Sequence, residues 1–152
     1  MLKEHKDFIV KLIDNDVSFL LIGGYAVIYH GYPRMTNDMD IWLKPTEENK
    51  QKFISLMSKE GIEEDGIQML SSFDFTKPNV FFFGEVPMRI DFLTQLQGIK
   101  YHDAERNKVF LSMDEKQIPI LCFNDLVITK MISGRPKDIA DLDELKKINN
   151  RK

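Results

Sequence analysis

Apolar positions at the start of the chain follow two different spacings. Residues 2–14 carry an apolar stripe at helical spacing, which predicts an amphipathic helix. Residues 17–22 form a continuous apolar run instead, which is typical of a strand buried on both faces. The pair Gly23-Gly24 ends this run, and we expect a short helix from the glycines to about His30.

The same criteria assign the rest of the chain to alternating strands and helices. The expected strands are residues 39–43, 80–83 and 88–93, with a hairpin turn at 84–87, and a weaker pair at 109–111 and 118–121. The expected helices are residues 45–61, 124–133 and a final helix that begins at Pro136. This pattern predicts an α+β fold, in which a small mixed sheet carries packed helices and ends in a helical C-terminal segment.

Two residue choices define the expected C-terminal helices. Asn124 is placed to cap the first of them, and Gly134 is placed to end it. The last helix is expected to bury the apolar residues Ile139, Leu142, Leu145 and Ile148.

Composition narrows the class of protein. The 152 residues are enough for one domain, which we expect to span residues 1–152, and the net charge of -3 argues against a broadly basic surface. The single cysteine excludes an internal disulfide, and no apolar run reaches the length of a membrane span. We therefore expect a cytoplasmic protein without a membrane partner.

Two aspartates, Asp38 and Asp40, stand one residue apart at the start of the strand expected at 39–43. Because side chains alternate across a strand, both carboxylates face the same side. Like charges at this separation repel each other unless a cation lies between them, and Mg²⁺ prefers oxygen ligands that it can share with phosphates. In isolation, such a pair is more often a solvated turn.

Asp91 changes that interpretation, because it is an acid within an otherwise apolar strand. A buried carboxylate needs a partner, and a neighbouring strand with Asp38 and Asp40 would provide one through a shared metal ion. A salt bridge to Arg89 on the same face is the alternative.

The glycine pair stands at a strand-to-helix junction. Glycines allow the backbone to approach a phosphate closely, and the following helix presents unpaired N–H groups. Gly23-Gly24 and the aspartates therefore predict phosphate donors and metal ligands at one edge of the sheet.

These motifs resemble the nucleotidyltransferase superfamily, whose fold is that of DNA polymerase β. Its signature of a Gly-Gly or Gly-Ser turn, a helix and D-x-D is matched by residues 19–27, 30–31 and 34–41. The resemblance is greatest to AbiEii-type toxins and small uncharacterised nucleotidyltransferases, and lincosamide-modifying nucleotidyltransferases have a related layout. Gly24 stands where many members carry a serine.

The resemblance implies specific roles for the motif residues. The catalytic, metal-binding triad would be Asp38, Asp40 and Asp91, with Mg²⁺ or Mn²⁺ as the cofactor. The nucleotide-binding residues would be Gly23, Gly24, Arg34, Thr36 and Lys130. Lys130 belongs to a C-terminal block, residues 130–142, that also resembles the group. The charged residues of that block, Arg135, Asp138 and Asp141, can equally form an ion-pair network on one helix face.

The implied reaction moves a nucleoside monophosphate from an NTP to an acceptor hydroxyl, with Asp91 on the acceptor side as the base. The acceptor is left open. RNA or a protein would suit a toxin of a toxin-antitoxin system, which has an antitoxin as partner. A small molecule would suit an enzyme that modifies a lincosamide or aminoglycoside antibiotic. A non-catalytic nucleotide- or partner-binding module is the third alternative.

Two other features have simpler interpretations. The run Phe81-Phe82-Phe83 can stack on a base, but an apolar core strand is the preferred interpretation. His30 is expected to cap a helix end rather than to act as a general base.

Overall fold

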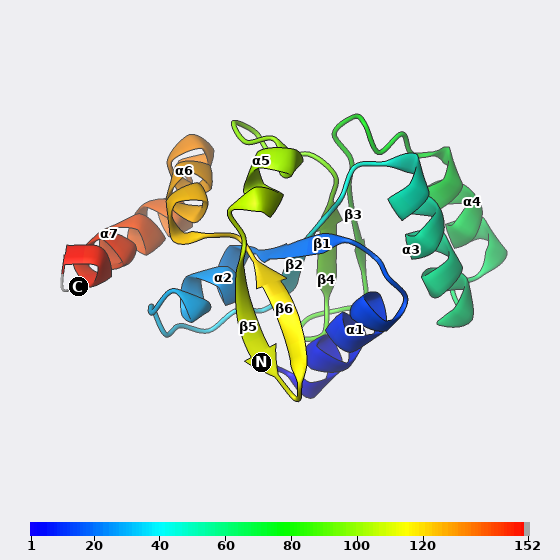
Figure 1. Cartoon of the computed structure of the whole chain (residues 1–152), viewed down its shortest axis with the longest axis horizontal. Helices are drawn as coiled ribbons and strands as arrows, with labels where there is room; N and C mark the ends of the chain where they lie inside the picture. The colour runs from blue at the N-terminus through cyan, green and yellow to red at the C-terminus, as the bar shows by residue number, and fades with distance from the viewer. Residues whose placement is uncertain (151–152) are drawn as a thin grey trace.

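The computed structural model describes residues 1–150, which form six strands and seven helices (Figure 1). The strands are β1 (Phe19–Ile22), β2 (Met39–Leu43), β3 (Val80–Phe83), β4 (Ile90–Leu93), β5 (Val109–Met113) and β6 (Lys116–Ile120). The helices are α1 (Lys3–Asp14), α2 (Gly23–Tyr29), α3 (Glu47–Lys59), α4 (Glu64–Ser72), α5 (Tyr101–Arg106), α6 (Phe123–Ser133) and α7 (Pro136–Asn150).

The strands form one mixed sheet in the order β3-β4-β2-β1-β6-β5. The neighbours β1 and β2 are antiparallel, whereas β2 and β4 are parallel. The hairpin expected between the strands at 80–83 and 88–93 is present as the antiparallel pair β3 and β4. The fold is therefore α+β, as the sequence predicts.

One face of the sheet carries most of the aromatic core. Phe81 and Phe92 are register partners on β3 and β4, and their rings stack with centroids 5.4 Å apart. Phe53 of α3 and Phe8 of α1 both contact Phe92 edge-on. We call this side, covered by α1 and α3, the back face.

The front face is covered over only part of its width. Trp42 of β2 packs edge-on against Tyr101 of α5, with centroids 5.1 Å apart. At the β3 edge, by contrast, Val80 and Phe82 are exposed. In Figure 1, α6 and α7 lie at the opposite end of the molecule from α3 and α4. The front face is thus open beside β3 and β4, where Asp91 is found.

Several local predictions were wrong. No element was predicted for the segments that form α4 and α5; α4 buries one residue, Leu70, and α5 is only 6 residues long. Asn124 does not cap α6, which begins one residue earlier at Phe123. Ile139 was expected to be buried but is 52% exposed. The buried side of α7 begins at Asp138 instead, and consecutive residues of a helix point about 100° apart.

No helix among residues 1–150 combines the length and the apolar character needed to cross a membrane. Gly134 does end α6, as expected, in the left-handed conformation with φ of 60°.

Candidate metal and nucleotide site

Three carboxylates meet on the front face of the sheet. Asp40 on β2 and Asp91 on β4 are register partners on adjacent parallel strands, so their side chains point to the same side. Asp38 lies just before β2. One carboxylate oxygen from each of the three residues lies within 4.8 Å of the other two. The structure therefore brings together the three acids that the sequence singled out.

The electrostatics of this cluster favour a cation. Burial, together with the charges of Asp38 and Asp91, raises the pKa of Asp40 to about 7. Burial and the nearby Asp38 also raise the pKa of Asp91, although Arg89 opposes this effect. Carboxylate oxygens so arranged fit a hard divalent cation such as Mg²⁺ or Mn²⁺, which would lower the repulsion among them.

Gly23 lies against the cluster and cannot carry a side chain. Its φ is +64°, which disfavours other residues, and a Cβ there would lie 2.1 Å from Oδ2 of Asp40. The backbone of the β1–α2 turn is thereby in direct contact with the Asp40 carboxylate. A phosphate held by this turn would lie next to the metal ligands.

Gly24 has no room for a side chain because Thr36 occupies the space. A Cβ at Gly24 would lie 2.5 Å from Oγ1 of Thr36 and 2.8 Å from its Cβ. The Thr36 hydroxyl donates a hydrogen bond of 2.9 Å to the carbonyl oxygen of Asp38. A threonine from the loop before β2 thus fills the space beside the glycine turn.

Asp91 belongs to the carboxylate cluster and also forms an ion pair with Arg89. This ion pair was the alternative interpretation of Asp91 in the sequence. Nε of Arg89 donates to Oδ1 of Asp91 at 2.9 Å. The Arg89 guanidinium lies 3.9 Å from the centre of the Phe82 ring. Phe82 is 55% exposed, so the expectation of a uniformly buried core strand at residues 81–83 was wrong for it. All four residues of β3 are apolar, so its sequence carries no signal that separates Phe82 from its neighbours.

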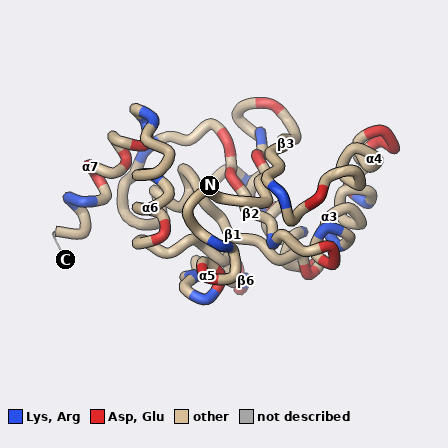
Figure 2. The backbone as a smooth tube through the Cα atoms, turned by 90° about the horizontal axis from the view of Figure 1, so that it is seen from above, with Lys and Arg blue, Asp and Glu red and all other residues tan. Residues whose placement is uncertain are grey.

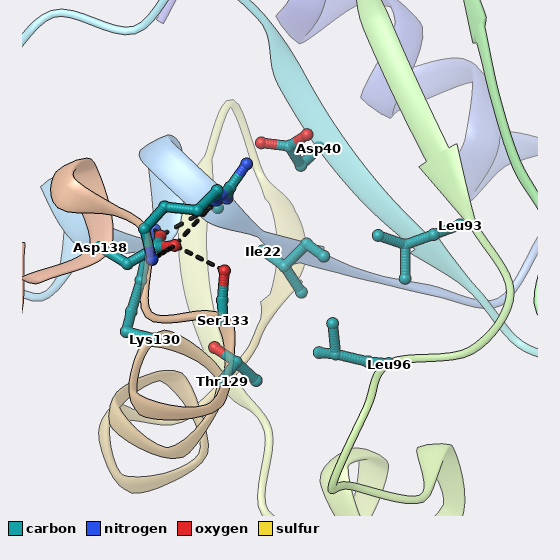
Figure 3. Close-up of a pocket in the computed structure, with 10 residues that line it drawn as sticks. Ile22, Asp40, Leu93, Leu96, Thr129, Lys130, Ser133 and Asp138 are labelled. Atoms are coloured by element: carbon teal, nitrogen blue, oxygen red, sulfur yellow. Dashed lines mark hydrogen bonds and ion pairs between the residues drawn. The ribbon is translucent and has the colours of Figure 1, made fainter.

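A hollow borders the cluster on the side of the C-terminal helices (Figure 3). Asp40 lies at one end of it, the apolar residues Ile22, Leu93 and Leu96 line one wall, and α6 provides the opposite wall. Thr129 and Ser133 of α6 point toward this space. The hollow is thus apolar on the sheet side and polar on the helix side.

Lys130 and Arg34 are both bonded to carboxylates of α7. Nζ of Lys130 lies 3.2 Å from Asp138 and 3.0 Å from Asp141, and all three side chains are buried. Arg34 donates two hydrogen bonds, of 2.8 and 3.0 Å, to Asp141. Arg135 completes the network with a bond of 2.8 Å to Asp138. The ion-pair network considered for this block is therefore present.

This network holds α7 against α6 and the loop before β2. Burial would raise the pKa of Asp138, but hydrogen bonds from Arg135, Ser133 and Lys130 lower it well below its usual range. Contacts of Lys130 and Arg34 with a nucleotide stay predictions, since both charges are directed at α7. His30 lies at the C-cap of α2, and its Nε2 is 2.8 Å from the carbonyl oxygen of Leu121.

Known structures share this architecture. Lincosamide antibiotic adenylyltransferase LnuA, in its lincomycin-bound form, superposes with a TM-score of 0.58 and 18% identity over 97% of this chain and 98% of that chain. An antigenic nucleotidyltransferase-like protein from Paracoccidioides brasiliensis gives a TM-score of 0.53 with 14% identity, over 91% of this chain and 72% of that one. A protein assigned as a nucleotidyltransferase from Thermotoga maritima gives 0.52 with 14% identity, over 100% and 97% of the two chains.

The chain therefore has the nucleotidyltransferase fold, as the motif resemblance implied. No family model matches the sequence, and no curated protein matches it. The superfamily fold is supported, whereas the narrower resemblance to AbiEii-type toxins stays a prediction.

Proposed function

We propose that this protein is a divalent-metal-dependent nucleotidyltransferase that uses Asp38, Asp40 and Asp91 as its catalytic carboxylates. The observation that carries this proposal is the convergence of their oxygens within 4.8 Å, beside the Gly23 turn of a nucleotidyltransferase fold. Asp38, Asp40 and Asp91 would hold Mg²⁺ or Mn²⁺, which would polarise the phosphate and lower the pKa of the acceptor hydroxyl.

The remaining steps are assigned to residues of the chain. Gly23 and Gly24 hold the triphosphate through their backbone, and Thr36 supports that turn from the adjacent loop. The acceptor hydroxyl attacks the α-phosphorus, the bond to the β-phosphate breaks, and pyrophosphate leaves. Asp91, on the acceptor side of the cluster, takes the hydroxyl proton.

We further propose that the acceptor is a small molecule with a hydroxyl group. Two observations support this choice. The lincosamide adenylyltransferase matches this chain over nearly the full length of both proteins. Lysine and arginine positions are interspersed with acidic ones along the chain (Figure 2), and the net charge is -3, whereas a bound RNA requires several cations along its phosphates. RNA or protein modification by a toxin with an antitoxin partner is the alternative.

The proposal is tested by incubating the purified protein with Mg²⁺ and each α-labelled NTP. The acceptors are a panel of hydroxylated antibiotics, total RNA and a cell protein extract. Wild-type protein is expected to label a small molecule, and Asp40→Asn and Asp91→Asn to reduce labelling by at least about a hundredfold. Asp143→Asn, an exposed carboxylate of α7, is the matched control.

Two results would contradict parts of this proposal. Full activity of Asp40→Asn would overturn the metal-dependent mechanism. Label found in RNA or protein, and absent from the small molecules, would overturn the choice of acceptor and support the toxin alternative.

A further inference from the structure

Arg89 occupies a defined position between the aromatic edge of the sheet and the metal-ligand cluster. Its backbone carbonyl accepts a hydrogen bond of 3.0 Å from the N–H of Met39, next to Asp38. Its side chain donates to Oδ1 of Asp91 at 2.9 Å. Both ends of the residue are thus attached to the strands that carry the carboxylates.

Phe82 fixes the guanidinium from the other side. Phe82 and Asp91 are register partners on β3 and β4, so their side chains stand next to each other on the front face. The guanidinium lies 3.9 Å above the centre of the Phe82 ring, within the range of a cation–π interaction. Phe82 is exposed on this face, and the Arg89 guanidinium lies over its ring.

Arg89 and a metal ion would both bind the carboxylate of Asp91. Oδ1 of Asp91 accepts from Arg89, and one oxygen of the same carboxylate belongs to the cluster that a cation would use. Two positive charges on one carboxylate repel each other, so strengthening one bond weakens the other. Asp38 and Asp40 have no comparable arginine contact among the hydrogen bonds of residues 1–150.

We propose that Arg89, held by Phe82, is a positioning residue that acts as a counter-ion for Asp91 and that a divalent cation must displace. Asp38 and Asp40 would hold the cation more strongly than Asp91 does, because Arg89 already neutralises Asp91. Full use of Asp91 as a ligand would require its ion pair with Arg89 to open. The guanidinium stays on Phe82, beside the acceptor side of the site. This inference rests on the proposed metal site.

The test measures Mn²⁺ binding by electron paramagnetic resonance with no nucleotide present. Arg89→Gln is expected to raise Mn²⁺ affinity roughly tenfold, because it removes the competing cation. Phe82→Leu changes no charge, yet it is expected to raise the affinity roughly two- to fivefold, since it removes the stacking that holds Arg89. Lys137→Gln is the charge-matched control, because Lys137 acts on Asp40 without a hydrogen bond to the cluster, and a change of at most about twofold is expected.

A second measurement follows Arg89 itself. The Nε–H signal of Arg89, assigned by its loss in Arg89→Gln, is expected to shift during an Mg²⁺ titration and to saturate with metal binding. The Nε–H signal of Arg135, which is bonded to Asp138, should stay in place.

The outcomes separate this inference from the proposed function. Mn²⁺ binding that is equal in wild type and Phe82→Leu, with an unmoved Arg89 signal, would overturn the role of Arg89 and leave the metal site intact. Mn²⁺ binding that is undetectable in wild type and in every variant would overturn both. In the background of Asp91→Asn, the effects of Arg89→Gln and Phe82→Leu should disappear.

Discussion

The side chain of Thr36 fills the space that a residue larger than glycine would need at position 24. The two residues approach so closely that a Cβ at Gly24 would lie 2.8 Å from the Thr36 Cβ. The two positions are therefore coupled: a side chain at one requires its absence at the other.

This coupling predicts a compensating pair of substitutions. Gly24→Ala alone should lower the free energy of unfolding by about 1–3 kcal/mol, because it overpacks the turn. Thr36→Gly in the same chain should recover a large part of that loss, since it removes both clashing atoms. Urea unfolding of the two single variants and the double variant measures the interaction energy. If the losses of stability caused by Gly24→Ala and Thr36→Gly simply added in the double variant, the two positions would not be coupled.

The raised pKa of Asp40 predicts that stability falls as the pH rises. With a pKa of about 7 in the folded state and 3.8 for an ordinary aspartate, the folded chain holds a proton that the unfolded chain releases between these values. The stability is therefore greatest below pH 4 for this group, and it decreases up to about pH 7. Asp40→Asn should stabilise the protein by about 1–3 kcal/mol more at pH 8 than at pH 5.

Thermal unfolding at the two pH values measures this difference. Asp143→Asn, on the exposed side of α7, serves as the control and should change stability by less than about 0.5 kcal/mol at either pH. An equal effect of Asp40→Asn at both pH values would contradict the assignment of the raised pKa to this residue.

Mg²⁺ or Mn²⁺ should stabilise the fold, and more strongly at pH 8 than at pH 6. The reason is that a metal and a proton compete for the same Asp40 carboxylate. At a metal concentration about a hundred times the dissociation constant, the gain should approach about 2.7 kcal/mol. Differential scanning fluorimetry with and without a chelator measures this gain. The double variant Asp38→Asn with Asp40→Asn should show no metal effect, and a retained gain there would place the metal elsewhere.

Lys130 is predicted to matter for stability whether or not a nucleotide is present. Lys130→Met would leave the buried carboxylates Asp138 and Asp141 with less positive charge, at an expected loss of about 3–5 kcal/mol. The exposed residue Lys146 offers the control Lys146→Met, for which a change below about 0.5 kcal/mol is expected. Urea unfolding measures both, and a loss below about 1 kcal/mol for Lys130→Met would favour a role confined to binding.

The ion-pair network between α6 and α7 should lose its contribution to stability in acid, because it contains Asp138. Its lowered pKa means that its contribution to stability is complete above pH 4 and is lost as the pH falls toward the folded-state value. Asp138→Asn should therefore lose stability at pH 7 but show a flatter dependence below pH 4. Circular dichroism measures the unfolding of wild type and of Asp138→Asn at each pH. If the stabilities of the two proteins changed in parallel with pH, this prediction would be wrong.

The sequence was most informative where strand alternation and an isolated acid coincide. Asp91 could be predicted as a partner of Asp40 because it interrupts an apolar strand, and the register of β2 and β4 places the two opposite each other. The glycine turn followed from the same local pattern. By contrast, Arg34 and Asp141 are 107 positions apart, and their contact depends on how α7 folds back.

Local patterns also failed where topology decides exposure. Phe81 and Phe82 are equally apolar, but the first lies in the core and the second lies at the open edge of the sheet. The two side chains point to opposite faces of β3, and only the back face is covered there, by Phe53 and Phe73; the sequence of β3 alone does not contain this difference. Thr36 beside Gly24 is a contact of the same kind, since it requires the loop before β2 to return over the turn.

The placement of Asp40 and Asp91 on adjacent parallel strands also disfavours a wrong register between β2 and β4. A shift of β4 by one residue would turn Asp91 to the back face, among Phe53, Phe81 and Phe8, and would bring Phe92 to the open front. A charge placed in that aromatic layer would be strongly unfavourable. The residues proposed for catalysis thus also penalise the wrong strand alignment, so that a chain which folds at all delivers its carboxylates to the correct side.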